Sequence, residues 1–409
     1  MKTFILIAIV VLFNSSMLIA QVSGCTDPNA NNFNSSATIN DGSCTYNQSN
    51  CTPYEHINPL PNELEENSGL IFFNQHFWTH NDSGGESCIY ELDSSNGQII
   101  RKIFIDNVSN YDWEDIAQDS LFIYIGEFGN NAGNRQDLKI LKLSKTDVIN
   151  NDTVSAEFIR FSYADQSSFS LPYQDHNYDC EALISYGDSL LLFTKNWSDK
   201  ETRIYKLPKD TGSYVLPISA QYNVDGLITA ADISPNKNQI VLCGYKNYIP
   251  FIWLFWDFQA NDILSGNKRR IDFPTSHIGY QTEGLCFVND EYFCISNEKS
   301  PSPLFYAQRI FLFKITNWTD PNTFGEYIPA KNDKIKIIPN PSKDYFLLKT
   351  EIDECLDFSL YNNIGNTVIT GTTMLSGATQ INTKSLQKGI YYLLLHSNYH
   401  SYCRKVIIL

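Results

Sequence analysis

The stretch Tyr111-Asp112-Trp113-Glu114-Asp115-Ile116-Ala117 places acidic residues directly before a short apolar run, and related stretches return along the middle of the chain. Aligned on this pattern, five rows stand out: Glu66-Asn67-Ser68-Gly69-Leu70, Asp112-Trp113-Glu114-Asp115-Ile116, Asp179-Cys180-Glu181-Ala182-Leu183, Thr229-Ala230-Ala231-Asp232-Ile233 and Gln281-Thr282-Glu283-Gly284-Leu285. They recur at roughly 45 to 65 residues, and strand-like sequence follows each. Such a period is typical of β-propeller blades, which bury both faces only by stacking on their neighbours. We therefore predict an all-β fold with a five- or six-bladed propeller.

The innermost strand of each propeller blade borders the central channel, so equivalent residues of different blades face one another. We expect Glu114, Glu181 and Glu283 to converge there. Their repulsion in a partly desolvated channel requires a cation or protonated carboxyl groups. Because oxygen ligands suit Ca²⁺ or Mg²⁺ better than zinc, calcium is the expected ion. The alternative is structural: the acids accept hydrogen bonds from backbone amides of the neighbouring blade.

In each unit a β-rich run follows the acidic row and then a polar break, which supplies the remaining candidate residues. The breaks are Trp78-Thr79-His80-Asn81-Asp82, Ile125-Gly126-Glu127-Phe128-Gly129, Phe193-Thr194-Lys195-Asn196, Cys243-Gly244-Tyr245-Lys246 and Ile295-Ser296-Asn297-Glu298. Glu127 and Glu298 extend the predicted metal set, and His80 and Asp82 are the candidate catalytic residues. As a general base, His80 would need a carboxylate or a metal-bound water within hydrogen-bond reach. The alternative is an ordinary loop histidine.

Composition and motifs narrow the function. The 409 residues carry a formal charge of −15. That charge argues against nucleic acid and anionic membrane surfaces as partners, because both attract basic proteins. No Gly-x-Ser-x-Gly elbow, His-Glu-x-x-His helix, phosphate loop or dinucleotide fingerprint occurs in the sequence.

The N-terminal residues 1–20 combine Lys2, an apolar run and a small-residue exit, which predicts a secretory signal peptide. No other stretch is long and apolar enough to span a bilayer, so no integral membrane span is expected after signal removal. Ten cysteines in an exported chain can form disulfides, and their spacings suggest the pairs Cys25 with Cys44, Cys286 with Cys294, and Cys355 with Cys403.

Residues 21–52 form a cysteine-bounded module rich in Asn and Asp. Its Cys25-Thr26-Asp27-Pro28 opening and Asp41-Gly42-Ser43-Cys44 end resemble short repeats of exported Bacteroidetes proteins. Asp27, Asn29 and Asn31 are spaced like the first ligands of a calcium loop, but no bidentate Glu follows. The alternative is a disulfide-closed spacer whose polar side chains satisfy turns.

The propeller is predicted over residues 53–325, and the proline-rich segment 47–62 could lend the outermost strand of the last blade. The middle region, with Trp78-Thr79-His80-Asn81-Asp82-Ser83-Gly84-Gly85 and Asp112-Trp113-Glu114-Asp115-Ile116-Ala117, resembles a family of exported bacterial propellers of uncertain role. More distantly, its Glu-Gly and Glu-Ala openings are similar to phytase-like esterase propellers and to the gluconolactonase and regucalcin group. That second resemblance implies a divalent metal at Glu114, Glu181, Glu283 and Glu298. The fourth row departs from it, with Ala231 in place of Glu.

Residues 334–409 carry Ile338-Pro339-Asn340-Pro341, Lys388-Gly389-Ile390-Tyr391 and a basic-apolar C-terminus. This segment resembles the type A C-terminal sorting domain of the type IX secretion system. The resemblance implies an Ig-like β-sandwich, the secretion machinery as a partner, and a secreted or surface-attached protein. Because no catalytic signature is complete, we predict an extracellular scaffold that binds a glycan, a peptide or a partner protein. The alternative is a divalent-metal-dependent hydrolase of esters, lactones or phosphate esters.

Overall fold

The computed structural model describes residues 21–260, 262–300, 306–319, 335–350, 356–362, 367–373, 377–396 and 401–409. The predicted signal peptide 1–20 and Cys355 of the predicted Cys355–Cys403 pair lie outside these residues. The chain divides into two compact units, Met1–Ile315 and Thr316–Leu409, each of which is described by itself. No helix among the described residues is long and apolar enough to cross a membrane.

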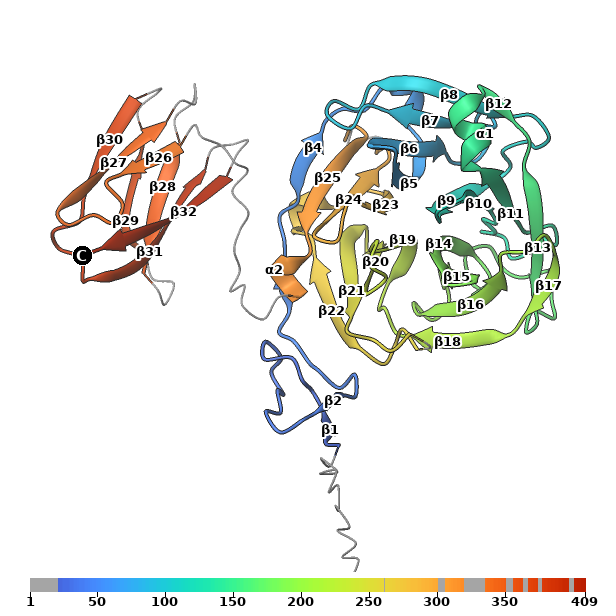
Figure 1. Cartoon of the computed structure of the whole chain (residues 1–409), viewed down its shortest axis with the longest axis horizontal. Coiled ribbons are helices and arrows are strands. Elements are labelled where there is room, and N and C mark those ends of the chain that lie inside the picture. Colours follow the sequence, from blue (N-terminus) through green and yellow to red (C-terminus); the bar gives the residue numbers. More distant parts are fainter. Residues whose placement is uncertain are drawn as a thin grey trace, which may run out of the picture. The chain divides into compact units, whose positions relative to one another are not determined.

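The first unit contains a five-bladed β-propeller, which confirms the predicted fold (Figure 1). Blade 1 contains β5 (Asn67–Phe73), β6 (His76–Asn81), β7 (Cys88–Leu92) and β8 (Ile99–Ile105), and blade 2 contains β9 (Trp113–Gln118), β10 (Phe122–Glu127), β11 (Lys139–Ser144) and β13 (Glu157–Tyr163). Blade 3 contains β14 (Cys180–Tyr186), β15 (Ser189–Thr194), β16 (Thr202–Pro208) and β18 (Ile218–Tyr222), and blade 4 contains β19 (Leu227–Ile233), β20 (Gln239–Lys246), β21 (Ile249–Trp256) and β22 (Asn267–Asp272). Blade 5 contains β23 (Thr282–Phe287), β24 (Tyr292–Asn297), β25 (Arg309–Lys314) and β4 (Tyr54–Ile57).

The ring is closed by the N-terminal strand β4, which pairs antiparallel with β25 and completes blade 5. Short parallel strands cover three other outer edges. They are β12 (Thr153–Val154) on β8, β17 (Gly212–Leu216) on β13, and β3 (Ser49–Asn50) on β22. Pairing of this kind satisfies edge N–H and C=O groups that would otherwise be free to pair with other chains.

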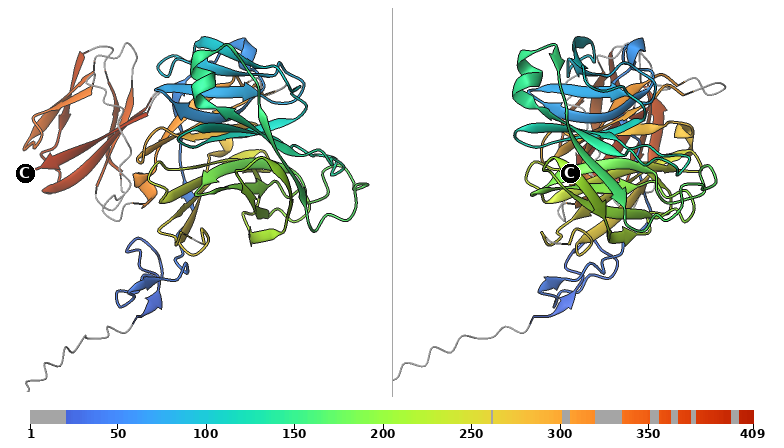
Figure 2. Two further views of the ribbon diagram at one scale, coloured as in Figure 1. Left: turned by 45° about the vertical axis from the view of Figure 1, so that its right-hand side comes forward. Right: turned by 90° about the vertical axis from the view of Figure 1, so that its right-hand side faces the viewer.

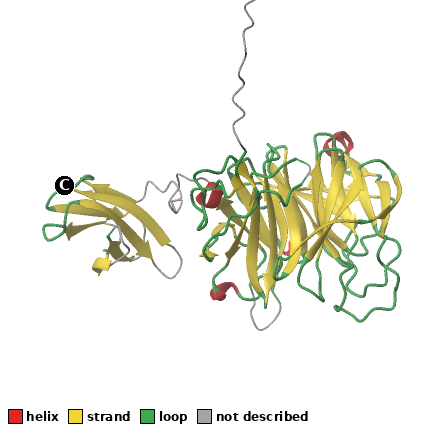
Figure 3. Ribbon diagram, turned by 90° about the horizontal axis from the view of Figure 1, so that it is seen from below, coloured by secondary structure: helices red, strands yellow, loops and turns green. Residues whose placement is uncertain are grey.

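Apolar side chains fill the spaces between neighbouring blades. The core between blades 2 and 3 includes Tyr124, Phe161, Leu192 and Tyr205, all of them buried. Strands dominate the propeller and helices are short (Figure 3). Helix α1 (Lys145–Asn150) lies on the outside of the ring beside β12 (Figures 1 and 2). The first strands of neighbouring blades contact one another around the ring and border the central channel (Figure 1).

A β-bulge interrupts the pairing near the start of each of these five inner strands. Between each inner strand and the second strand of its blade, the register shifts by one residue, at Ser68/Leu70, Cys180/Ala182, Ile228/Ala230 and Thr282/Gly284, and opposite Ile125/Glu127 in blade 2. A bulge leaves one residue without a ladder partner and turns its side chain away from the regular alternation. The repeated acidic row of the sequence coincides with this bulge.

The N-terminal module carries β1 (Ser23–Gly24) and β2 (Ile39–Asn40) and is closed by the Cys25–Cys44 disulfide, as predicted. The predicted Cys286–Cys294 bridge is wrong, because both residues are free thiols. They lie opposite each other on β23 and β24 and pack in the core shared by blades 1 and 5. Their spacing reflects strand register, and the thiols act there as small apolar side chains.

The second unit is a small β-sandwich. One antiparallel sheet contains β26 (Ile335–Ile338), β27 (Tyr345–Thr350) and β30 (Gly377–Asn382). The other contains β29 (Thr367–Thr372), β28 (Asp357–Tyr361), β31 (Gly389–His396) and β32 (Ser401–Ile408). Phe346, Leu348, Leu360 and Leu393 are fully buried in a common core.

Candidate functional site

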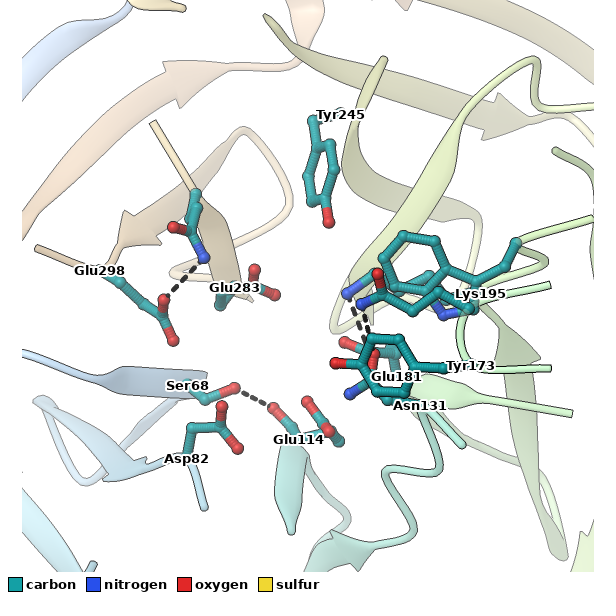
Figure 4. Close-up of a pocket in the computed structure, with 13 residues that line it drawn as sticks. Ser68, Asp82, Glu114, Asn131, Tyr173, Glu181, Lys195, Tyr245, Glu283 and Glu298 are labelled. Atoms are coloured by element: carbon teal, nitrogen blue, oxygen red, sulfur yellow. Dashed lines mark hydrogen bonds and ion pairs between the residues drawn. The ribbon is translucent and has the colours of Figure 1, made fainter. Parts of the chain in front are cut away.

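A pocket of about 200 Å³ lies at the end of the channel where the inner strands begin (Figure 4). Every blade contributes to its lining, which consists of Ser68, Asp82, Glu114, Asn131, Tyr173, Gln174, Glu181, Lys195, Trp197, Tyr245, Gln281, Glu283 and Glu298. Five carboxyl groups and one ammonium group therefore face a small volume. If all were ionised, their formal charge would be −4.

Two positions in each blade supply most of this lining. The first is the residue at or next to the inner-strand bulge, occupied by Ser68, Glu114, Glu181 and Glu283 in blades 1, 2, 3 and 5. The second follows the second strand, where the backbone N–H groups of Asp82, Gly129, Lys195 and Glu298 donate to the carbonyl oxygens of Glu66, Asp112, Asp179 and Gln281. These recurring bonds lie within each blade and hold the residue after its second strand beside the start of its inner strand, so both positions face the same end of the channel.

The structure brings four of the five predicted metal candidates, Glu114, Glu181, Glu283 and Glu298, to this pocket. Glu127 lies elsewhere. It is fully buried, accepts a 2.7 Å hydrogen bond from Arg135 Nη2, and accepts another from the Tyr111 N–H. Blade 2 has one extra residue after its second strand, so Gly129 takes the position that Glu127 was expected to fill.

In the fourth of the five aligned rows, Ala231 aligns with Glu181, but the structurally equivalent residue lies two positions earlier. The bulged residue of blade 4 is Thr229, whereas Ala231 pairs regularly with Leu242. Thr229 Oγ1 donates to the Thr282 carbonyl oxygen at 2.5 Å, and Tyr245 lines the pocket in the place that Lys195 has in blade 3. Blade 4 thus contributes a phenol to the pocket and no carboxylate.

Three carboxylates form a tight cluster at one side of the pocket. Oxygen atoms of Asp82, Asp112 and Glu114 all lie within 4.8 Å of one another. Gly129 makes this approach possible, because a Cβ at that position would lie 2.0 Å from Glu114 Oε1 and 2.5 Å from Asp112 Oδ2. Asp112 therefore belongs to the candidate metal set, although the sequence analysis did not predict it. The sequence feature that could have indicated it is its position two residues before Glu114.

Burial is the main electrostatic influence on this cluster. It raises the pKa of Asp112 to about 7 and that of Asp82 to about 6, and neighbouring carboxylates add to both shifts. Burial also raises the pKa of Glu114 well above its usual value. Two unit charges 4.8 Å apart repel by about 3 kcal/mol at an effective dielectric constant of about 20. The cluster therefore favours either bound protons or a bound cation.

A single ammonium group occupies the opposite side. Lys195 Nζ lies 3.1 Å from Glu181 Oε1, and both side chains are almost fully buried. Burial disfavours the charged lysine, but Glu181, Tyr245 and Glu283 more than offset this and raise the pKa of Lys195. The ammonium group also lies 5.0 Å from the Trp197 ring centroid and 5.5 Å from that of Tyr245. Lys195 is thus a fixed internal cation that compensates one of the five acids.

Two buried carboxylates that line the pocket, Glu114 of the cluster and Glu283, have no partner among the described residues. Glu114 and Glu283 are 6% and 7% exposed, and among the described residues no hydrogen bond or ion pair reaches either carboxylate group. Glu298, by contrast, accepts a 3.1 Å hydrogen bond from Gln281 Nε2 (Figure 4). Burial raises the pKa of Glu283 to about 7. Because both side chains line the pocket, their oxygen atoms are accessible there to hydrogen-bond donors or to a cation.

His80, one of the two predicted catalytic residues, does not line the pocket. It is fully buried, its Nδ1 lies 3.0 Å from the Asn81 carbonyl oxygen, and its ring meets Trp113 edge-on at 5.6 Å. Burial lowers the pKa of His80 to about 4. A base in this position has no path to a ligand in the pocket. Asp82, the other predicted catalytic residue, is part of the carboxylate cluster.

The donor set fits a hard divalent cation. Carboxylate oxygens bound to one Ca²⁺ at about 2.4 Å lie no more than about 4.8 Å apart, and those of Asp82, Asp112 and Glu114 satisfy this limit. The described pocket residues offer no histidine or cysteine ligand, which zinc would favour. The N-terminal module fits an ion less well, because Asp27 already accepts bonds from Tyr46 Oη at 2.6 Å and the Asn29 N–H at 2.9 Å.

Comparison with known proteins identifies the C-terminal unit. Residues 336–409 match the family described as secretion system C-terminal sorting domain. The chain is therefore secreted or attached to the outer cell surface, and its sorting domain implies interaction with secretion machinery. No curated protein shows significant sequence similarity to the chain.

Solved structures with some likeness include a putative TolB from Agrobacterium tumefaciens, with 12% identity, a TM-score of 0.34, and coverage of 61% of this chain and 78% of that chain. The propeller domain of Cps50 (Swd1) from Myceliophteria thermophila has 10% identity, a TM-score of 0.33, and coverage of 63% and 98%. A chain of a mitotic checkpoint complex has 11% identity, a TM-score of 0.30, and coverage of 60% and 63%, so this chain spans less than two thirds of it.

Proposed function

We propose that this exported protein is an extracellular binding protein whose axial pocket holds a divalent cation, with calcium preferred. The observation that carries the proposal is the approach of Asp82, Asp112 and Glu114 oxygens within 4.8 Å, beside the unpartnered Glu283. A cation offsets the repulsion of these carboxylates and removes the cost of burying them. Bound calcium would keep open coordination positions toward the pocket, where a ligand could reach it.

Thermal unfolding tests the cation. The full mature chain should melt at a higher temperature in calcium than in chelator, because an ion that binds only the folded state stabilises it. Asp112→Asn and Glu114→Gln should each reduce that difference strongly. Asp188→Asn, which removes an exposed carboxylate far from the pocket lining, should retain it. Equal melting temperatures of the unmodified chain in calcium and in chelator would refute the proposal.

A metal-dependent hydrolase is the second candidate. Buried pocket acids with raised pKa values, such as Glu283 and Glu298, could serve in general acid–base catalysis. The distant resemblance of the Glu-Gly and Glu-Ala openings to gluconolactonase and phytase-like propellers supports the same reading. Turnover of an ester, lactone or phosphate-ester panel that is lost on chelation and in Glu181→Gln would favour the hydrolase. A chain that binds calcium and turns over none of them is a binding protein.

A further inference from the structure

An exposed aromatic side chain stands at the rim of the pocket. Tyr173 lines the pocket and is 68% exposed, in the loop that connects β13 to β14. Large exposed aromatic side chains at a pocket are frequent ligand contacts, because they combine a large contact area with few rotatable bonds. The hydrogen bonds of the surrounding loop show whether Tyr173 is held in this position.

The loop is fixed on both sides of Tyr173. Gln174 donates to Asn131 through its backbone N–H and through Nε2, at 2.9 Å in each case. His176 Nε2 lies 3.0 Å from the Asn131 carbonyl oxygen, and Gln166 Nε2 donates to the Gly133 carbonyl oxygen at 2.9 Å. These bonds hold the loop against the segment that follows β10. Tyr173 is therefore presented to the pocket by an ordered backbone.

The pocket chemistry restricts what Tyr173 can help to bind. Apart from the rings of Tyr173, Trp197 and Tyr245, every lining side chain is a carboxyl, amide, hydroxyl or ammonium group. Pockets for drug-sized ligands are mostly apolar and occupy about 300–1,000 Å³, whereas this one is polar and measures about 200 Å³. The excess of carboxylates also repels phosphates and other anions. Lipids, acyl chains and anionic ligands are therefore poor fits.

We infer that the pocket binds the terminal ring of a neutral carbohydrate. One sugar ring matches the small volume, and its hydroxyl groups can donate to Glu114 and Glu283. Its ring oxygen and hydroxyl groups can accept from Lys195 and Gln174. The apolar face of the ring can pack on Tyr173 at the rim. The inference rests on the proposed binding role of this pocket. A calcium ion in the pocket would also coordinate two neighbouring hydroxyl groups of the sugar.

Isothermal titration of the full mature chain tests this inference. The probes are the methyl glycosides of glucose, galactose, mannose and N-acetylglucosamine, with putrescine and glucuronate as cationic and anionic comparisons. At least one neutral glycoside should bind, and Tyr173→Ala should weaken it about tenfold, as expected for loss of one aromatic contact. Tyr54→Ala, which removes a 55% exposed tyrosine outside the pocket lining, should leave the affinity unchanged.

The outcomes separate this inference from the proposed cation. A calcium-dependent melting temperature without binding of any neutral glycoside would overturn the carbohydrate and leave the cation standing. Binding of putrescine or glucuronate in place of the glycosides would also overturn it, as would glycoside binding that survives in both Tyr173→Ala and Glu283→Gln. Glycoside binding that is lost in these variants and is equal in calcium and in chelator would support the carbohydrate and show that calcium does not contact it, while the melting temperature still tests the cation.

Discussion

The mouth of the channel, where the pocket lies, and the buried interior of the channel use neighbouring acids of strand β9 in opposite ways. Glu114 lines the pocket with no partner for its carboxylate among the described residues. Asp115, the next residue, is fully buried and accepts bonds from three backbone N–H groups: Ile116 at 2.8 Å, Leu183 at 2.9 Å and Ala231 at 3.3 Å. The bulge at the start of β9 sends these two acids to different places.

The interior carboxylates connect the blades. Asp115 joins the inner strands of blades 2, 3 and 4, and Asp232 of blade 4 accepts from the Phe287 N–H of blade 5 at 2.8 Å. The structural use of acids that the sequence left open is therefore real, but Asp115 and Asp232 perform it rather than Glu114, Glu181 and Glu283. A buried carboxylate with three N–H donors is part of the framework. One without partners in a pocket is available to a ligand.

The largest expected effect is on the closed interior. Asp115→Asn replaces one acceptor oxygen by an NH₂ group, which faces the N–H donors of Ile116 or of Leu183 and Ala231. Each buried group left unsatisfied costs about 1–3 kcal/mol. The melting temperature should fall by about 5–10 °C. Differential scanning calorimetry measures this, with Asp188→Asn as the matched control, and an unchanged value would remove Asp115 from the framework.

A pH dependence of intermediate size is expected at the mouth. The pKa values of Asp112 and Glu283 rise from 3.8 and 4.5 to about 7, and that of Asp82 rises from 3.8 to about 6. Between those values the unfolded chain loses protons that the folded chain keeps. Stability in chelator should therefore fall as pH rises from about 4.5 to about 7. Saturating calcium should flatten this slope, and a slope that is the same with and without calcium would contradict ion binding at the mouth.

Glu283→Gln at the channel mouth should change the melting temperature less than Asp115→Asn in the interior, and in the opposite direction. In chelator at mildly alkaline pH, Glu283→Gln removes a buried, unpartnered charge from the mouth. The melting temperature should rise by about 2–4 °C. A fall like that of Asp115→Asn would show that Glu283 also belongs to the framework.

The smallest effect is expected outside the channel. Tyr46→Phe removes the hydrogen bond to Asp27 in the N-terminal module, which is worth about 1 kcal/mol. The melting temperature should fall by about 2 °C or less, while the difference between calcium and chelator stays the same. A loss of that difference would move the cation from the channel mouth to the Cys25–Cys44 module.

The sequence by itself determined the architecture. The recurring acidic rows, the N-terminal strand that closes blade 5, the Cys25–Cys44 bridge and the sorting domain were all readable from period, spacing and motif. Equivalent positions in repeated blades must meet at the channel, so the approach of Glu114, Glu181 and Glu283 could also be expected. These inferences need only the repeat, because neighbouring blades pack in the same way.

Only the tertiary structure decided which acids face the pocket. A bulge adds one residue to a strand, and a shift of one residue turns a side chain to the opposite side. For that reason Thr229 rather than Ala231 holds the equivalent position in blade 4. Asp112 joins the carboxylate cluster because Gly129 leaves room for it, and Glu127 pairs with Arg135 because blade 2 has one extra residue after its second strand. His80, on the second strand of blade 1, packs against Trp113 outside the pocket lining. Bulge positions depend on packing between neighbouring blades, and the alternating pattern of a single strand does not record them.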